Sequence, residues 1–305
     1  MNKASINLRR VTISALLLSL ALVLKLTTSL YIPMFGQNGM RVGVSGIFSM
    51  LPAFLFGPVF GMIVAGLADL LGYLLKPAGA YLPLMTLIVA LGGFLRGALW
   101  AVLRGRSGKT MRIAVAAFSA LLLILGICNV VFLNADGVNG AFYDGVQIES
   151  ISTDSMHLVS RMLITRTINT KDPAGNLATY VTFVTAGVIG SAALGLLLLA
   201  ADWLLSGKLK STAGIGQIPQ LLIALIVSGL IVTTLNTVVL RETIYASWKV
   251  LPFTVVWIPR VIEEILGNTV KAYFIALLLG IAGRQRGLRA LTETSFRRRG
   301  SDMKL

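Results

Sequence analysis

The chain has 305 residues, of which 56% are hydrophobic and 13% charged, and its mean hydropathy is +0.83. About a quarter of the residues of a soluble domain are charged because its surface faces water, so this composition excludes an ordinary soluble protein and predicts an integral membrane protein. The formal charge of +15 would indicate nucleic acid as the ligand of a soluble protein. In a membrane protein, Lys and Arg gather instead in cytoplasmic loops, so we expect contact with lipid and no nucleic acid.

The residues that carry most enzyme chemistry are scarce. The single cysteine, Cys128, excludes an intrachain disulfide and a Cys-based zinc site, and the single histidine, His157, leaves no His cluster for a metal. No Ser-His-Asp set, HExxH motif or pair of catalytic carboxylates can be assembled from the sequence. We therefore expect a protein that is not an enzyme and that needs no metal or cofactor.

Eight apolar segments follow one another along the chain, and most of them approach the roughly 20 residues that cross a bilayer as a helix. The second is short, and Gly57-Pro58 separates it from the third, which predicts a tight helical hairpin, although one kinked helix would also break there. The expected fold is an all-α membrane protein of about eight spans. These spans cover about 11–31, 43–56, 58–75, 83–103, 112–133, 180–205, 219–240 and 254–283.

The distribution of positive charge supports this count. With the N-terminus in the cytoplasm, 16 of the 27 Lys and Arg residues lie in inner segments, seven in outer segments and four inside spans. This bias follows the positive-inside rule and predicts a multi-pass protein with both termini in the cytoplasm. Arg9-Arg10 before an apolar run resembles a signal peptide, but Lys25 interrupts the run and seven spans follow, so we expect an uncleaved first helix.

The longest connection, 134–179, is polar and is expected on the outer side. Its Asp-Gly and Asn-Gly pairs mark turns, and Ser155–Thr165 could form a short helix with Met156, Val159, Met162 and Leu163 on one side. Loops of this length are usually functional or disordered, so a lid over an outward-facing site and a solvated linker both remain open. His157 is expected to be an ordinary surface residue.

A few ionisable residues lie inside the predicted spans, where they are expensive and usually face a partner or a cavity. Asp69 and Arg96 lie at similar depths on neighbouring spans and are expected to form a structural ion pair. Arg260 precedes Glu263 and Glu264 by one helical turn and could pair with them or reach an outer pocket. The loop sequence Gly108-Lys109-Thr110 resembles the end of a P-loop but lacks the earlier glycine, so the chain should not bind ATP.

The stretch from Arg41 to Thr86 is more specific. It reads RVGVSGI, then LFGPVFG, then GLADLLGYLLKPAGAYLPLMTL, and it resembles the substrate-binding (S) components of energy-coupling-factor (ECF) vitamin transporters, in particular the folate family. Two later motifs, Leu235-Asn236-Thr237 and Pro259-Arg260-Val261-Ile262, resemble those of the same family. The sequence departs from the family at Met85 and Glu263, near the expected site, and by two additional spans.

This resemblance implies a six-helix core, interrupted by an inserted two-helix hairpin. The corresponding segments are 1–110 (core helices one to four), 111–206 (hairpin with the 134–179 loop), 207–283 (the last two core helices) and 284–305 (basic tail). It further implies capture of a vitamin outside a prokaryotic cell and uptake driven by a transmembrane coupling subunit and two ATPase subunits. The small residues Ala15 and Ser19 would contact that coupling subunit.

Folate would require cations for its carboxylates and aromatic and amide groups for its pterin ring. The residues expected to bind substrate are therefore Arg41, Tyr73, Lys76, Tyr81, Asn236 and Arg260. Pantothenate or a pyrimidine precursor is the alternative ligand within the same class. A stand-alone proton-coupled transporter that uses Asp69, Arg96 or Glu263, and a membrane enzyme acting through the outer loop, are the alternatives from other classes.

Overall fold

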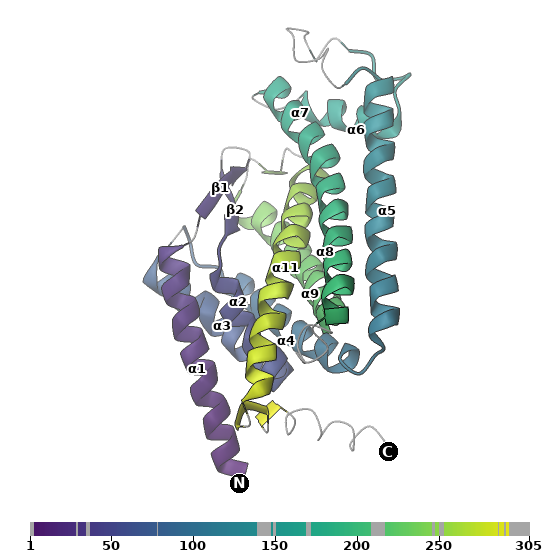
Figure 1. Cartoon of the computed structure of the whole chain (residues 1–305). Coiled ribbons are helices and arrows are strands. Elements are labelled where there is room, and N and C mark those ends of the chain that lie inside the picture. Colours follow the sequence, from purple (N-terminus) through teal and green to yellow (C-terminus); the bar gives the residue numbers. More distant parts are fainter. Residues whose placement is uncertain are drawn as a thin grey trace, which may run out of the picture.

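The chain folds into a bundle of long helices with one small β-hairpin (Figure 1). The computed structural model describes residues 3–28, 30–34, 37–77, 79–138, 148, 151–168, 172–208, 217–245, 248–249, 253–285, 287–289 and 291–292. The helices are α1 (Lys3–Thr27), α2 (Ser45–Phe56), α3 (Pro58–Leu75), α4 (Pro83–Leu103), α5 (Gly108–Ala135), α6 (Leu158–Thr167), α7 (Pro173–Thr182), α8 (Val188–Lys208), α9 (Ile218–Thr243) and α11 (Phe253–Arg284). A π-helical turn, η2 (Phe183–Gly187), joins α7 to α8, and strands β1 (Leu30–Met34) and β2 (Gln37–Val42) lie between α1 and α2.

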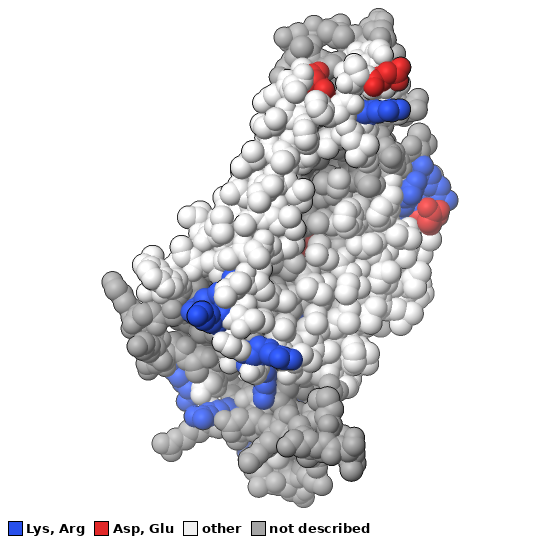
Figure 2. All heavy atoms as spheres, turned by 90° about the vertical axis from the view of Figure 1, so that its right-hand side faces the viewer, with Lys and Arg blue, Asp and Glu red and all other residues white. Residues whose placement is uncertain are grey.

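Seven of the described helical segments are long and apolar enough to cross a membrane, and α2 is a shorter apolar helix of 12 residues. Their outer faces are rich in Leu, Ile and Val, and Figure 2 shows a broad uncharged area on the side of the molecule where α5 lies. Exposed apolar side chains on this scale are stable only in a hydrocarbon environment. The prediction of an all-α integral membrane protein is therefore confirmed.

The short second helix and the third form the predicted hairpin at Gly57-Pro58. Gly57 has a φ of 95°, a backbone conformation that favours glycine, and Pro58 occupies the first turn of α3. A side chain added at Gly61 would overlap Ala53, so residues equally spaced on either side of Gly57 face each other. The two helices therefore run antiparallel, which excludes the alternative of one kinked helix.

The segment after α1 differs from the prediction. The first span was expected to continue to residue 31, but the helix ends at Thr27 and Leu30 begins β1. The strands pair antiparallel, with Tyr31 opposite Arg41. Isoleucine and tyrosine favour a strand, and Pro33 cannot continue a helix, which accounts for the earlier helix end.

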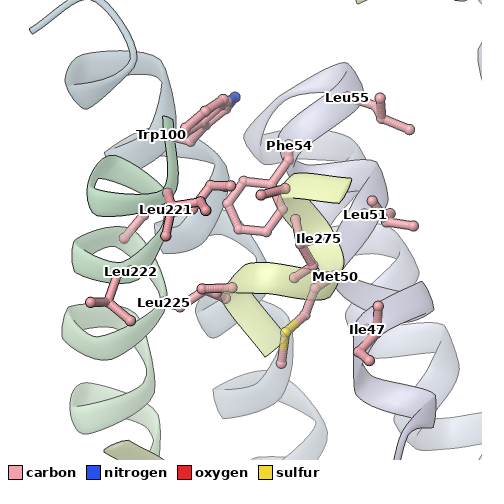
Figure 3. Packing of buried hydrophobic residues seen from close by; sticks show 14 of the residues in the cluster. Ile47, Met50, Leu51, Phe54, Leu55, Trp100, Leu221, Leu222, Leu225 and Ile275 are labelled. Carbon is pink, nitrogen blue, oxygen red and sulfur yellow. The ribbon is translucent and has the colours of Figure 1, made fainter. Parts of the chain in front are cut away.

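The main core surrounds α2. Its phenylalanine Phe54 packs edge-on against Trp100 of α4, with ring centroids 5.7 Å apart and planes at 85°. Figure 3 shows Met50 and Phe54 pointing from α2 toward the leucines of α9 and toward Ile275 of α11. This cluster joins the first four helices to the last two. Its buried members include Ile47, Leu51, Leu55, Leu221, Leu222, Leu225, Ala272 and Ala276.

The segment predicted as an inserted hairpin contains the long helices α5 and α8, which pack against each other, and a small core of its own. Figure 1 shows α5 and α7 extending well beyond the end of α1, with α6 lying between them. The predicted short helix is present as α6, and Leu163 and Ile164 are buried with Leu133 of α5 and Leu177 of α7. The described part of 134–179 therefore packs on itself, and the cavity described below receives no side chain from it. It resembles neither a solvated linker nor a lid over that cavity.

Candidate functional site

A polar cavity of about 210 Å³ lies within the core, between α1, α2, α3, α4 and α11. It adjoins the residues that follow β2, and its walls combine small residues with four charged side chains. Cavities with a few convergent polar groups are the usual form of small-molecule sites. The lining residues are Ala21, Leu22, Lys25, Gly43, Ser45, Gly46, Ser49, Met50, Ala65, Ala68, Asp69, Val89, Arg96 and Lys271.

Lys25 enters the cavity from the last turn of α1. Its Nζ donates a hydrogen bond to the backbone oxygen of Ala68 on α3, at 3.1 Å. A side chain at Gly72 would overlap the Lys25 side chain, so this glycine makes the space in which the lysine lies. The cation is thus held between two helices inside the membrane-spanning region, where an ionised group normally marks a functional site.

Lys271 enters from the opposite side, on α11, and is held by a short polar chain. Its Nζ donates to Oδ1 of Asn268 at 3.4 Å, and Nδ2 of Asn268 donates to Oε1 of Glu264 at 2.8 Å and to the backbone oxygen of Leu225 at 3.0 Å. Asn268 is fully buried. This chain of hydrogen bonds fixes the position of the lysine and links it to the partly buried carboxylate of Glu264.

Arg96 of α4 supplies the third cation and is 7% exposed. Its Nε is buried without a hydrogen-bond partner among the described residues. An unsatisfied donor on a buried cation costs free energy, and the cost is offset when an acceptor reaches it. Because Arg96 lines the cavity, a carboxylate or carbonyl oxygen of a bound molecule could supply that acceptor.

The predicted ion pair between Asp69 and Arg96 is wrong. Both residues line the cavity, but no ion pair joins them; Oδ2 of Asp69 accepts a hydrogen bond of 2.7 Å from Thr86 instead. Thr86 also lies 3.0 Å from the hydroxyl of Tyr81. Asp69 therefore faces the beginning of α4, whereas Arg96 lies more than two turns further along that helix.

The predicted aromatic residues lie beside this carboxylate. The rings of Tyr73 and Tyr81 are in contact, with centroids 5.0 Å apart, and the Tyr73 hydroxyl donates to the backbone oxygen of Gly79 at 3.1 Å. Tyr81, Thr86 and Asp69 thus form a hydrogen-bonded wall that leads into the cavity. Lys76, which follows α3, is exposed and lies outside the cavity lining.

The other two predicted residues lie outside the cavity, and Arg260 belongs to a separate cluster at the α9–α11 end. The guanidinium of Arg260 lies over the ring of Trp248, 5.8 Å from its centroid, and Trp248 is buried beside Tyr245. Oδ1 of Asn236 is buried with no hydrogen-bond partner in the described part of the chain. Neither Asn236 nor Arg260 lines the cavity. The side chain of Arg41 lies outside the described residues.

Sequence reasoning missed Lys25 and Lys271 as candidate site residues. Both interrupt otherwise apolar spans, which was the available signal, but the first was used only to argue against a signal peptide. The structure brings them together with Arg96 around one cavity. Three basic side chains and one carboxylate therefore line a space that is otherwise made of small and apolar residues.

The fold and the cavity define a multi-pass membrane protein with a candidate small-molecule site between its spans. A family profile described as the ECF-type riboflavin transporter, S component, matches residues 5–171, which is more than half of the chain. The chain belongs to that family, and it is a substrate-binding component of an ECF transporter rather than an enzyme. Family membership implies a coupling subunit and ATPase partners in the cell membrane. No curated protein and no solved structure matches the chain.

Proposed function

We propose that this S component captures a vitamin that carries a carboxylate, such as folate, in the cavity between α1 and α11 for ATP-driven uptake by its partner subunits. The observation that carries the proposal is the charge of the cavity wall. Lys25, Arg96 and Lys271 face it together, and Asp69 is the one carboxylate among its described lining residues. Within a membrane such an excess of cations favours an anionic ligand, because opposite charges attract strongly at low dielectric.

The geometry supports a division of roles within the cavity. Arg96 would engage a ligand carboxylate through its Nε, which its own surroundings leave without an acceptor, and Lys25 and Lys271 would add charge from either side. Asp69 would accept hydrogen bonds from the N–H groups of a pterin-like ring, with Tyr81 at the edge of the same wall. The binding roles expected for Arg41, Tyr73, Lys76, Asn236 and Arg260 stay predictions.

Riboflavin is the second candidate, because the description of the matching family names it. Riboflavin has no carboxylate, so it would leave the three cations of the cavity without a matching anion. Pantothenate, by contrast, carries a carboxylate and suits the same wall. The charge of the cavity therefore favours folate or pantothenate over riboflavin.

Calorimetric titration of the purified full-length chain with folate, pantothenate and riboflavin tests this proposal. We expect either folate or pantothenate, the two vitamins that carry a carboxylate, to bind. Arg96→Met or Lys271→Met should weaken that binding by roughly 10- to 100-fold, since each removes a charge-assisted contact. Arg112→Met, which changes a basic residue outside the cavity, should bind as the wild type does. Binding of riboflavin alone, unaffected by either cavity variant, would contradict an anionic substrate but not membership of the transporter class.

We further propose that α1 contacts the coupling subunit through the face that carries Ala15 and Ser19. Both side chains are exposed, and the hydroxyl of Ser19 donates to the backbone oxygen of Ala15 at 2.9 Å. The face is therefore small and has its hydroxyl satisfied within the helix. Such surfaces let a second membrane helix approach closely.

A further inference from the structure

A second cavity, of about 250 Å³, lies between the inserted hairpin and the core. We call it the hairpin groove. It is walled by α5 and α8 on the side of the insertion and by α9 and α11 on the side of the core. Its lining residues are Ala114, Val115, Phe118, Ser119, Leu122, Ser191, Gly195, Leu222, Ile223, Ile226, Val227, Leu230, Ile265 and Thr269.

The hairpin groove presents hydrocarbon to whatever occupies it. Two of its three hydroxyls are satisfied within their own helices, since Ser191 donates to the backbone oxygen of Gly187 at 2.7 Å and Thr269 to that of Ile265 at 2.6 Å. All of its lining residues belong to helices that are long and apolar enough to span the membrane. The groove is thus at the depth of lipid acyl chains and cannot be filled favourably by water.

One end of the hairpin groove lies beside a strongly basic loop. Ala114 is on the second turn of α5 and Leu222 on the second turn of α9, so the groove begins next to the connection between α4 and α5. That connection and the first two turns of α5 carry four basic residues, Arg104, Arg106, Lys109 and Arg112. Gln220 of α9 donates to the backbone oxygen of Arg106 at 3.3 Å and ties the loop to the core. Figure 2 shows Lys and Arg gathered below the uncharged area on this side.

We propose that the hairpin groove binds an anionic glycerophospholipid, with an acyl chain between the hairpin and the core and its phosphate on the 104–112 loop. The apolar wall selects the chain, and the loop selects a negative headgroup, as basic pockets beside membrane helices do. The lipid would fill the space that the side chains leave between α5 and α9. It would thereby hold the inserted hairpin against the substrate-binding core.

The headgroup preference is tested with the delipidated full-length chain in detergent, titrated with phosphatidylglycerol or phosphatidylcholine and followed by native mass spectrometry. We expect the wild type to prefer phosphatidylglycerol, and Lys109→Gln with Arg112→Gln to weaken its binding by roughly 30-fold, because each basic side chain adds about fivefold. Arg284→Gln with Arg289→Gln removes the same charge from the end of α11 and the residues that follow it, and should change the binding of phosphatidylglycerol little. Equal binding of both lipids by the wild type would overturn the proposed headgroup site.

Filling the groove tests the acyl-chain site independently. Ala114 and Ala120 are both exposed on α5, but only Ala114 lines the hairpin groove. We expect A114F to retain several-fold less of either lipid than the wild type, and A120F to retain as much as the wild type. Equal retention by the two variants, with both folded by circular dichroism, would overturn the site. Detection of a dimer that A114F dissociates would also overturn it, because a second copy of the chain would then cover the groove.

Discussion

The cavity wall depends on one contact between a glycine and a lysine. Lys25 is the last basic residue of α1, and its side chain passes directly over Gly72 of α3 to reach the backbone oxygen of Ala68. A charged amine within a membrane span is stable only where it is held by polar groups or faces a cavity, and here both conditions are met. Gly72 therefore shapes the cavity although it does not itself line it.

We predict that Gly72→Ala weakens substrate binding through Lys25. The added methyl would occupy the space of the lysine side chain and displace its amine from the cavity. The expected loss of affinity is roughly tenfold, similar to that of Lys25→Met. Titration of both single variants and the double variant measures the coupling, and the double variant should bind no more weakly than Lys25→Met alone.

Gly66→Ala is the matched control on the same helix. A methyl group there would meet the side chain of Ala90, and Lys25 is not among its neighbours. It should therefore leave substrate affinity unchanged. Additive losses in the G72A/K25M double variant would show that Gly72 acts on binding by a route other than the lysine.

At the scale of single residues, sequence reasoning could identify the charged residues but not their neighbours. Counting residues along two helices predicted similar depths for Asp69 and Arg96, and both line the cavity. The carboxylate of Asp69, however, accepts a hydrogen bond from Thr86, which lies more than two turns before Arg96 on α4, so residue counting did not identify its partner. The contribution of Lys271 required knowledge of which face α11 turns toward α2.

Among the elements, α5 and α6 are joined by a contact between Asp136 and His157. Asp136 follows α5, and its carboxylate accepts hydrogen bonds from the backbone N–H of His157 at 3.0 Å and faces the ring Nδ1 at 2.9 Å. The His157 ring also stacks on Phe132, with centroids 4.8 Å apart. The histidine expected to be an ordinary surface residue thus positions the start of α6 over the end of α5.

We predict that this contact weakens in acid. Burial alone would raise the pKa of Asp136, but the hydrogen bonds it accepts and the nearby His157 ring hold that pKa below its usual value. A carboxylate with a depressed folded-state pKa stabilises the fold above its unfolded pKa and loses that effect as the pH falls through the folded value. Hydrogen exchange of the α6 amides, corrected for its intrinsic pH dependence, should therefore show more frequent opening as the pH falls from about 5 to about 3.

The Asp136→Asn variant separates this contact from general acid effects. At neutral pH its α6 amides should exchange roughly fivefold faster than those of the wild type, because an amide accepts weaker hydrogen bonds than a carboxylate. Between pH 5 and 3 the opening of α6 in this variant should change little. An acid response as large as that of the wild type would show that another group is responsible.

Sequence patterns predicted the long helices better than the short elements. A sustained apolar run of about 20 residues has few alternatives to a membrane helix, so α3 and α4 were predicted within their observed bounds. The β1–β2 hairpin was missed, because its apolar first strand continues the hydropathy of α1. The independent core of the insertion depends on contacts between α5, α6 and α7, which no local pattern reveals.

At the scale of the whole molecule, the polar cavity lies among helices α1 to α4 and α11. The described residues of α5 to α8 contribute nothing to its lining. The sequence also lacks a complete nucleotide-binding motif, since Leu103 stands where a P-loop requires glycine. The ECF family implies ATPase partner subunits, which would supply the energy for transport.

We predict that the small residues Ala15 and Ser19 are needed for attachment of those partners to α1. Ala15→Leu with Ser19→Leu should prevent co-purification of the coupling subunit and ATPases, because two large side chains would hold a partner helix away from α1. Substrate binding by the isolated variant should remain intact, since neither residue lines the cavity. Ala117→Leu with Ala120→Leu enlarges two exposed residues of α5 and should leave the complex intact.

Vesicle uptake with these proteins decides between a dependent and a self-contained transporter. Vesicles that hold the wild-type chain alone should show no uptake under a pH gradient, whereas vesicles that also hold the coupling subunit and ATPases should take up substrate when ATP is supplied. The Ala15→Leu/Ser19→Leu variant should fail in the second assay even though it binds substrate. Uptake by the chain alone, driven by protons, would instead favour a secondary transporter, with Asp69, Arg96 and Glu263 as the ionisable groups to test.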